Sequence, residues 1–178
     1  MKWIALLVLL ILLTATQAAS QVPEDRRLIV PGQRIGAWTL QMTVQDIVGA
    51  LGRPTRILSG AQLISSLGIV GFQVDLRAYR WERIGLYAYT RDDRSIPLLE
   101  ATGAPEFVTE KGVKWDMPRA DVESAYGLPT RVTQRTTHPA EVTLQYNEIG
   151  LEVGFATTGR VGFIGVFRPG TASSIWKP

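Results

Sequence analysis

Few side chains in this sequence could perform covalent or acid–base chemistry. The only histidine, His138, precedes Pro139 in a threonine-rich segment, and no Gly-x-Ser-x-Gly turn accompanies it. Because a serine hydrolase needs a base beside its nucleophile, this setting favours a loop role for His138 over a catalytic one. The chain has no cysteine, which excludes thiol catalysis, thiolate metal sites and disulfide bonds.

The acidic residues do not form a recognisable ligand set either. Asp92 and Asp93 are adjacent in a segment typical of a turn, where carboxylates accept local hydrogen bonds, and one such dipeptide makes a poor calcium loop. The glycines between Gly150 and Gly170 alternate within predicted strands and do not open a helix, unlike those of a phosphate-binding loop. The sequence therefore predicts no catalytic residues, no metal site and no cofactor, and the protein is not expected to be an enzyme.

One group of side chains is typical of a binding surface. The strand alternation predicts that Arg80 lies across from Tyr87, with Tyr89 and Leu98 nearby, on the sheet face away from the core. Tyrosine and arginine are enriched in interface hot spots, and an arginine over a tyrosine ring is itself attractive. We predict that these four residues form a protein-binding surface. In the alternative, the tyrosines are half-covered by other parts of the chain.

Two parts of the chain are candidates to cover these tyrosines. One is the segment Gly60 to Gly71, and the other is the C-terminal tail, residues 169–178, which contains Trp176. The later strands should present more polar side chains at the positions that match the binding surface. Gln145 is expected across from Glu152, with Thr143 and Gly154 beside them, as a solvated face.

The elements that would position these side chains occur twice in the sequence. The segments MTVQDIVGALGRPTR (42–56) and MPRADVESAYGLPTR (117–131) lie 75 positions apart and share seven of fifteen residues. Ile-Gly-Leu occurs at 84–86 and again at 149–151, only 65 positions apart. The first copy therefore contains about ten additional residues, which we assign to Gly60 to Gly71 as a short helix or a long loop. We predict repeat unit 1 at 28–102 and repeat unit 2 at 106–168.

Each repeated segment carries helix signals. Thr43 is a good N-cap with Asp46 three residues later, and Gly52 occurs where the first helix should end. The second helix should begin near Pro118 and end at Gly127. Both helices are expected to be two to three turns long.

The strand segments that follow predict hairpins with defined pairing. Turns at 83–84 and 148–149 place Trp81 opposite Leu86 and Tyr146 opposite Leu151. Further turns at 93–94 and 158–159 add Leu99, Ile164 and Val166 to the same apolar face. The predicted fold class is α+β, with two tandem repeats, each a short helix or helix pair packed on an antiparallel meander of three to four strands.

The N-terminal sequence and the charge balance indicate a compartment. Residues 1–20 combine Lys2, an apolar run from Ile4 to Leu13 and small residues near Ala18, which is typical of a secretory signal peptide. Lysine and arginine number 19 and aspartate and glutamate 16, with no run of like sign. The protein is therefore expected to be periplasmic or secreted, without a membrane span after signal cleavage and without a nucleic-acid surface.

The spacing of the first repeated segment resembles a known family. The pattern L-x-M-T-x-x-D-I-x-x-x-L-G-x-P at 40–54, followed by a strand, a Gly-Leu hairpin and another strand, resembles the SmpA/OmlA family of bacterial outer-membrane assembly lipoproteins. Two tandem copies are similar to the fold of the β-lactamase inhibitor protein. The resemblance covers roughly 35–167 and implies a compact α+β scaffold that binds another protein of the bacterial envelope. The chain lacks the lipidated cysteine of the assembly lipoproteins, so lipid tethering is not expected.

The sequence supports two functional hypotheses. The first is a non-enzymatic protein-binding or scaffolding module of the bacterial envelope, whose partner is another envelope protein. The alternative is a carrier of a small apolar or aromatic ligand, held between the sheet and the segment Leu63 to Val70.

Overall fold

The computed structural model describes residues 24–62, 75–134 and 141–171. The predicted signal peptide, most of the Gly60 to Gly71 segment, His138 and all but the start of the C-terminal tail lie outside these residues. The fold is mixed α+β and consists mainly of strands, arranged in two sheets, with short helices.

The helices are α2 (Val44–Leu51) and α4 (Arg119–Tyr126), with 3-10 turns η1 (Glu24–Arg27) and η2 (Glu82–Ile84). The small sheet has the order β3-β2-β1-β8, formed by β1 (Leu28–Val30), β2 (Arg34–Ile35), β3 (Trp38–Thr39) and β8 (Val108–Thr109). The large sheet has the order β4-β5-β6-β7-β12-β11-β10-β9. Its strands are β4 (Arg56–Ser59), β5 (Arg77–Trp81), β6 (Leu86–Thr90), β7 (Leu98–Thr102), β9 (Arg131–Gln134), β10 (Val142–Tyr146), β11 (Leu151–Phe155) and β12 (Val161–Phe167).

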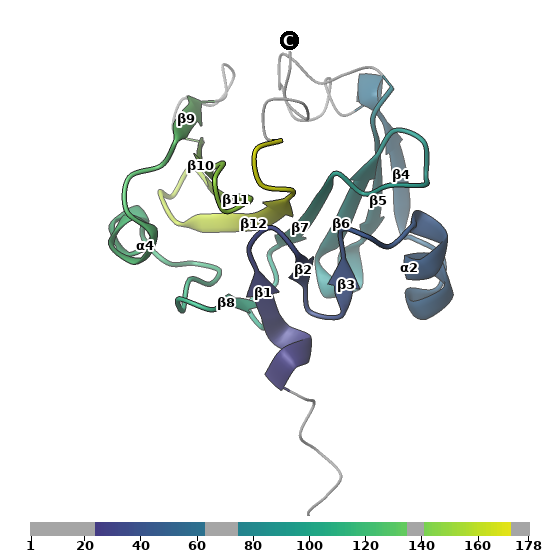
Figure 1. Cartoon of the computed structure of the whole chain (residues 1–178), viewed down its shortest axis with the longest axis horizontal. Coiled ribbons are helices and arrows are strands. Elements are labelled where there is room, and N and C mark those ends of the chain that lie inside the picture. The colour runs from purple at the N-terminus through teal and green to yellow at the C-terminus, as the bar shows by residue number, and fades with distance from the viewer. Residues whose placement is uncertain (1–23, 63–74, 135–140, 172–178) are drawn as a thin grey trace, which may run out of the picture.

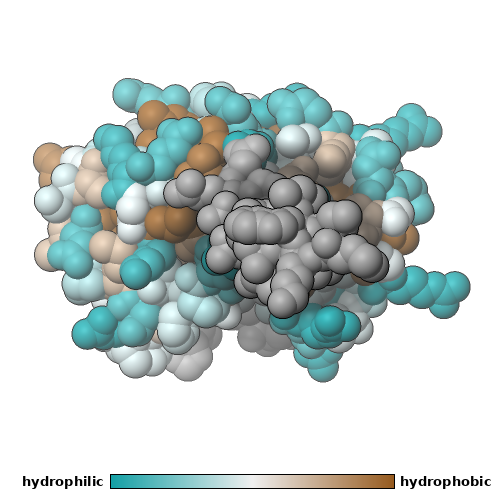
Figure 2. All heavy atoms as spheres, turned by 90° about the horizontal axis from the view of Figure 1, so that it is seen from below, coloured by the Kyte–Doolittle hydropathy of each residue, from teal (hydrophilic) through white to brown (hydrophobic). Residues whose placement is uncertain are grey.

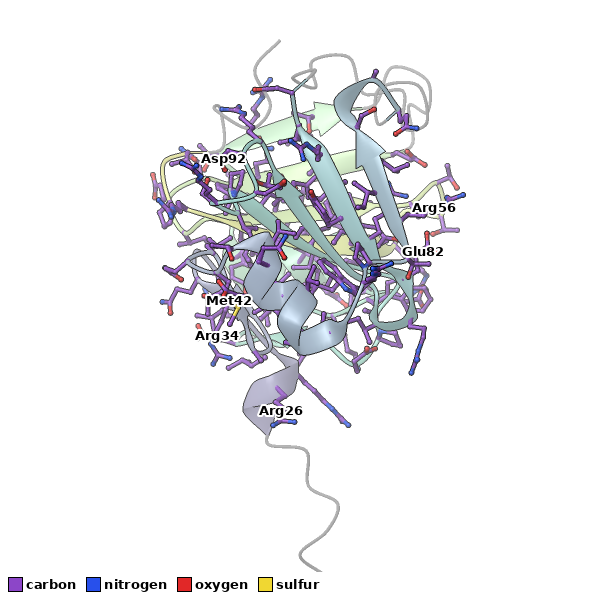
Figure 3. The ribbon with its side chains drawn as sticks, turned by 90° about the vertical axis from the view of Figure 1, so that its right-hand side faces the viewer. Arg26, Arg34, Met42, Arg56, Glu82 and Asp92 are labelled. Atoms are coloured by element: carbon purple, nitrogen blue, oxygen red, sulfur yellow. The ribbon has the colours of Figure 1, made fainter. Side chains whose placement is uncertain are left out.

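The large sheet is antiparallel throughout and places β7 beside β12 at its centre. In Figure 1, α2 lies at one side of the molecule, α4 at the other, and the small sheet lies below and between them. Figure 3 shows α2 crossing in front of the strands of the large sheet. Seen from below, the described surface is mostly hydrophilic, with small groups of hydrophobic residues between (Figure 2).

The two helices begin and end where the sequence predicts. The Thr43 side chain accepts a hydrogen bond from the Asp46 amide, and the Asp46 carboxylate accepts one from the Thr43 amide, which completes a capping box. Pro118 is the N-cap of α4, and Gly52 and Gly127 end the helices at φ of 77° and 79°.

Each helix end is tied to the large sheet by an aromatic side chain. Trp81 Nε1 donates to the Gly52 carbonyl at 3.0 Å, and Tyr146 Oη donates to the Gly127 carbonyl at 3.3 Å. These carbonyls lie at the helix ends and have no partner within the helix, and the aromatic side chains supply one. The two bonds therefore tie each helix end to a strand of the large sheet, across 29 residues in the first case and 19 in the second.

The Pro-Thr-Arg ends of the repeated segments are also tied to the hairpins. The Thr55 hydroxyl accepts from the Glu82 amide at 3.3 Å, and the Thr130 hydroxyl accepts from the Asn147 amide at 3.2 Å. Each threonine thus fixes the chain leaving its helix against the start of a hairpin turn.

The Ile-Gly-Leu segments form the turns of those hairpins. Gly85 and Gly150 have φ of 62° and 69°, in the left-handed region that favours glycine. The Gly85 carbonyl accepts from the Thr102 amide at 2.8 Å, and the Gly150 carbonyl accepts from the Phe167 amide at 3.0 Å. Each glycine therefore joins a hairpin turn to the far end of the third strand.

The predicted cross-strand pairs of the inner face are confirmed. Trp81 pairs with Leu86, and Tyr146 pairs with Leu151. The pairing of β6 with β7 is symmetric about residues 93–94, and that of β11 with β12 is symmetric about residues 158–159, as the predicted turns require. The connections themselves are longer than two residues. This face, the apolar sides of both helices and the small sheet form one core, which includes Ile29, Ile35, Leu40, Ile47, Leu99, Val122, Val153, Ile164 and Val166.

The small sheet was not predicted. Its β1 runs antiparallel to β2 and parallel to β8, so that Ile29 lies opposite both Ile35 and Thr109. Residues at the start of the predicted repeat unit 1 therefore pair with residues assigned to repeat unit 2. Within the described parts of the chain, no helix has the length and hydropathy needed to cross a bilayer.

Candidate functional site

A row of side chains crosses the whole large sheet on the face away from the helices. Each member lies opposite the next in strand register, which places neighbouring Cα atoms about 5 Å apart. From β4 to β9, the row consists of Arg56, Arg80, Tyr87, Glu100, Gly165, Glu152, Gln145 and Arg131. We call it the outer row. It has arginines at both ends and two carboxylates near its centre.

Arg80 and Tyr87 form the contact that the sequence predicts. The Arg80 guanidinium carbon lies 4.8 Å from the centre of the Tyr87 ring, a cation–π arrangement. Both side chains remain partly exposed. Burial raises the pKa of the Tyr87 hydroxyl, and the nearby Arg80 charge opposes that rise. Tyr87 is therefore neutral at physiological pH and can donate a hydrogen bond.

Glu100 is the centre of a hydrogen-bond network in the first half of the row. The Tyr89 hydroxyl donates to Glu100 Oε2 at 2.9 Å, and the Thr102 hydroxyl donates to Glu100 Oε1. Burial, followed by the charge of Glu100, raises the pKa of Tyr89 well above its ordinary value. Tyr89 thus stays a neutral donor, and the network holds a carboxylate inside the protein.

Glu152 and Gln145 form the corresponding contact in the second half. Gln145 Nε2 donates to Glu152 Oε2 at 3.2 Å, and both residues are buried. Glu152 lies over Gly165, because a Cβ added at that glycine would be 2.7 Å from Glu152 Cγ. Glycine at this position therefore makes room for the carboxylate between β11 and β7.

The structure corrects the predicted exposure of this face. Tyr89 is 3% exposed and Leu98 is 0% exposed, so neither belongs to an exposed surface, whereas Arg80 and Tyr87 do. Gln145 and Glu152 were expected to be solvated and are buried as well. The reason is that apolar side chains occupy both faces of the central strands, which favours burial on both sides.

The buried apolar set on the outer face is separate from the main core. It consists of Leu76, Ala78, Tyr89, Leu98 and Phe167. Sequence reasoning also missed Glu100. Its orientation follows from strand alternation, because its neighbours Leu99 and Ala101 face the core. Glu100 therefore faces outward, opposite Tyr87. Its burial depends on packing and carries no sequence signal.

Asp92 and Asp93 accept local hydrogen bonds. Asp92 Oδ1 accepts from the amides of Arg94 and Ser95, which lowers the pKa of Asp92. Asp93 Oδ1 accepts from the Tyr79 hydroxyl at 2.8 Å, and Asp93 Oδ2 accepts from Arg77. Across the described ranges, no group of three or more acidic or histidine residues is arranged to hold a metal ion.

Comparison with known proteins found distant similarity to solved structures and no family. No family model matches the chain, and no curated protein matches it. A DUF4309 family protein, YjgB from Bacillus subtilis, is 16% identical at a TM-score of 0.48, with 77% of this chain and 88% of that one covered. A cysteine-rich secretory protein from Staphylococcus aureus is 13% identical at a TM-score of 0.49, with 83% of this chain covered. The match spans only 51% of that protein.

At these TM-scores neither structure assigns a function or a family to this chain. The resemblance to the SmpA/OmlA lipoproteins and to the β-lactamase inhibitor protein is not addressed by these comparisons and stays a prediction.

Proposed function

We propose that this protein is an exported, non-enzymatic protein-binding module of the bacterial envelope, built from two copies of one helix-and-meander unit. Its partner contacts the part of the outer row that contains Arg80 and Tyr87. The observation that carries the proposal is the cation–π pair on a partly exposed sheet face, 4.8 Å from guanidinium carbon to ring centre.

Matching hydrogen bonds support the duplication. Trp81 to Gly52 corresponds to Tyr146 to Gly127, with offsets of 65 and 75 positions that equal those of the repeated sequences. The threonine bonds and the glycine-turn bonds of the two halves correspond at the same offsets. Three pairs of bonds at corresponding positions are expected if both halves derive from one unit, because the same local geometry then recurs in each half.

The contrast between the two halves supports the choice of surface. The positions of Arg80 and Tyr87 in the first half correspond to Gln145 and Glu152 in the second, and the latter two are buried against each other. Exposed arginine and tyrosine supply more binding energy in protein interfaces than most other residue types. The first half is therefore the half that can receive a partner.

Site-specific photocrosslinking in the native envelope tests this proposal. A photoreactive phenylalanine analogue replaces Tyr87 in one strain and Leu128, which is 90% exposed, in a control strain. We expect one defined protein adduct from position 87, its loss when Arg80→Ala is added, and no such adduct from position 128. Equal adducts from both positions, or none from position 87 in a folded protein, would contradict the proposal.

Export is tested separately by the intact mass of protein from the envelope fraction. Cleavage between Ala18 and Gln21 is expected to remove the first 18 to 20 residues. A full-length mass in the cytoplasmic fraction would contradict export and leave the binding surface to be judged by the crosslinks.

The carrier alternative is favoured by one observation. The outer face has its own buried apolar set, with Leu98 and Phe167 fully buried outside the main core. Under this alternative, an apolar ligand packs against these side chains in place of the protein atoms that cover them in the structure. Native mass spectrometry of protein purified from its own host distinguishes the functions, because a co-purifying small molecule is expected only for the carrier.

A further inference from the structure

Two arginines at the edge of the large sheet face each other without a counter-ion. Arg56 of β4 lies directly opposite Arg80 of β5, an arrangement in which like charges repel. Within residues 24–62, 75–134 and 141–171, neither side chain forms a salt bridge or a hydrogen bond with another residue. The Arg80 Nε atom is buried and has no acceptor there.

Some arginines of the described chain pair with carboxylates: Arg77 with Asp93 at 2.9 Å, and Arg119 with Glu123 at 2.8 Å. Arg56 and Arg80 form no such pair within the same residues. They differ from other arginines without an ion pair in that they face each other in strand register.

The surroundings of the pair are basic as well. Arg53 precedes β4 and Arg83 follows β5, so both lie at the same end of the sheet edge, and both are exposed. Glu82 lies at this end as well (Figure 3), and among the described residues it forms no salt bridge with Arg56 or Arg80. Four arginines lie at this end, against the exposed Glu82 and the buried Glu100 beyond Tyr87, so the exposed charge is positive and attracts carboxylates.

The position on the edge strand selects the form of the partner. β4 is the outermost strand of the large sheet, with β5 on one side and no described strand on the other. An edge strand offers backbone groups that an extended peptide can pair with, and side chains of the peptide then alternate along it. A guanidinium fork binds a carboxylate through two parallel hydrogen bonds.

We infer that Arg56 and Arg80, which we call the arginine edge, bind carboxylate side chains of an extended acidic segment of the partner protein. The inference rests on the proposed protein-binding function and specifies the chemistry of the partner. Carboxylates seated against the exposed ends of the two guanidinium groups offset their repulsion. Tyr87, stacked under Arg80, fixes the direction of that fork.

The second half of the chain supplies a matched control. Arg131 occupies the position of Arg56 in the other copy of Pro-Thr-Arg, is exposed, and lies opposite Gln145. It is an edge arginine on β9 without a facing arginine. Its replacement therefore removes the same charge from the protein without touching the arginine edge.

Fluorescence anisotropy with labelled peptides tests the inference on the full mature chain. The probes are a short peptide in which glutamate alternates with threonine, its lysine counterpart, and vesicles containing phosphatidylglycerol. We expect the glutamate peptide alone to bind, with affinity falling about tenfold in Arg56→Gln/Arg80→Gln and less than about twofold in Arg131→Gln. Added salt should weaken the binding.

Several outcomes overturn the inference. They are no binding of the glutamate peptide, equal loss in the Arg131→Gln control, or binding to the vesicles without binding to the peptide. Folding of the double variant is checked by near-ultraviolet circular dichroism. If it does not fold, the peptide affinity of the single variant Arg56→Gln tests the inference, because replacing an exposed side chain leaves the fold intact. A Tyr87 crosslink together with a failed peptide assay would leave the proposed function standing and reject only the acidic partner.

Discussion

Gly150→Ala should destabilise this protein far more than a glycine-to-alanine change at a left-handed turn where the added Cβ meets open space, such as Gly159. Gly150 has a φ of 69°, and a Cβ there would overlap the Phe167 carbonyl oxygen and lie 2.8 Å from the Gly32 Cα. The left-handed conformation alone costs an alanine about 1 kcal/mol. Relief of the overlap must move Gly150 away from β12 and from the turn before β2.

That movement breaks identifiable bonds. The Gly150 carbonyl accepts from the Phe167 amide at 3.0 Å and from the Gly32 amide at 3.0 Å. Each buried hydrogen bond contributes about 1 kcal/mol, so the total loss in free energy of unfolding should reach about 3 kcal/mol. Gly85→Ala should behave in the same way, since its Cβ would overlap the Thr102 carbonyl oxygen and lie 2.8 Å from the Ala104 Cβ.

Gly159→Ala is the control for the backbone term. Gly159 has a φ of 73°, and nothing lies within 4 Å of an added Cβ, so only the conformational cost of about 1 kcal/mol applies. Urea unfolding followed by tryptophan fluorescence measures all three variants. If Gly150→Ala and Gly159→Ala lose the same stability at equal m-values, the close approach of β12 to the turn does not constrain this position, and the reasoning fails.

Three further expectations concern the cap of α2 and a buried tyrosine. Thr43→Ala should cost about 1 kcal/mol in urea unfolding, because it removes the N-cap acceptor, and Thr43→Ser should restore most of it. Hydrogen bonds from Thr43 lower the pKa of Asp46, so their stabilising effect is present above pH about 4 and is lost below it. Asp46→Asn should therefore flatten the acid limb of the stability profile, and an unchanged limb would contradict this. The raised pKa of Tyr89 keeps it protonated while folded, so stability should fall as pH rises above about 10, and less steeply in Tyr89→Phe.

Local features of the fold could be predicted from the sequence because single residue types determine them. The capping box of Thr43 and Asp46 and the end of α2 at Gly52 depend on neighbours within one helix. The pairing of Trp81 with Leu86 depends on a short turn and on alternation. These signals act over a few residues, and all of them are found in the structure.

The remaining features depend on contacts between distant segments. The parallel pairing of Ile29 with Thr109 joins strands of three and two residues, too short to carry a pattern of their own. Alternation correctly placed Tyr89 and Leu98 on the outer face, but it could not show that this face is buried. Whether a second face is covered is decided by the rest of the chain, and the sequence of the strand does not record it.

The proposed duplication explains why the candidate site lies in only one half. Inner-face positions must fill one shared core, and they remain apolar in both halves: Trp81 and Tyr146, Leu86 and Leu151, Ala88 and Val153, Leu99 and Ile164, Ala101 and Val166. Outer-row positions contribute to neither a helix nor that core, so they were free to diverge. In the second half they are filled by a buried Gln145–Glu152 pair and by Gly165.

On the proposed function, the first half carries side chains whose cost in stability is offset by binding a partner. Arg56 opposite Arg80 lowers the stability of the free protein, whereas glutamine opposite Arg131 at the matching position does not carry that repulsion. Glutamine is thus compatible with this position of the sheet, as Gln145 in the second half shows. Retention of the facing arginines beside a partly exposed Tyr87 is consistent with selection for binding an anionic group at this edge, at the expense of stability in its absence.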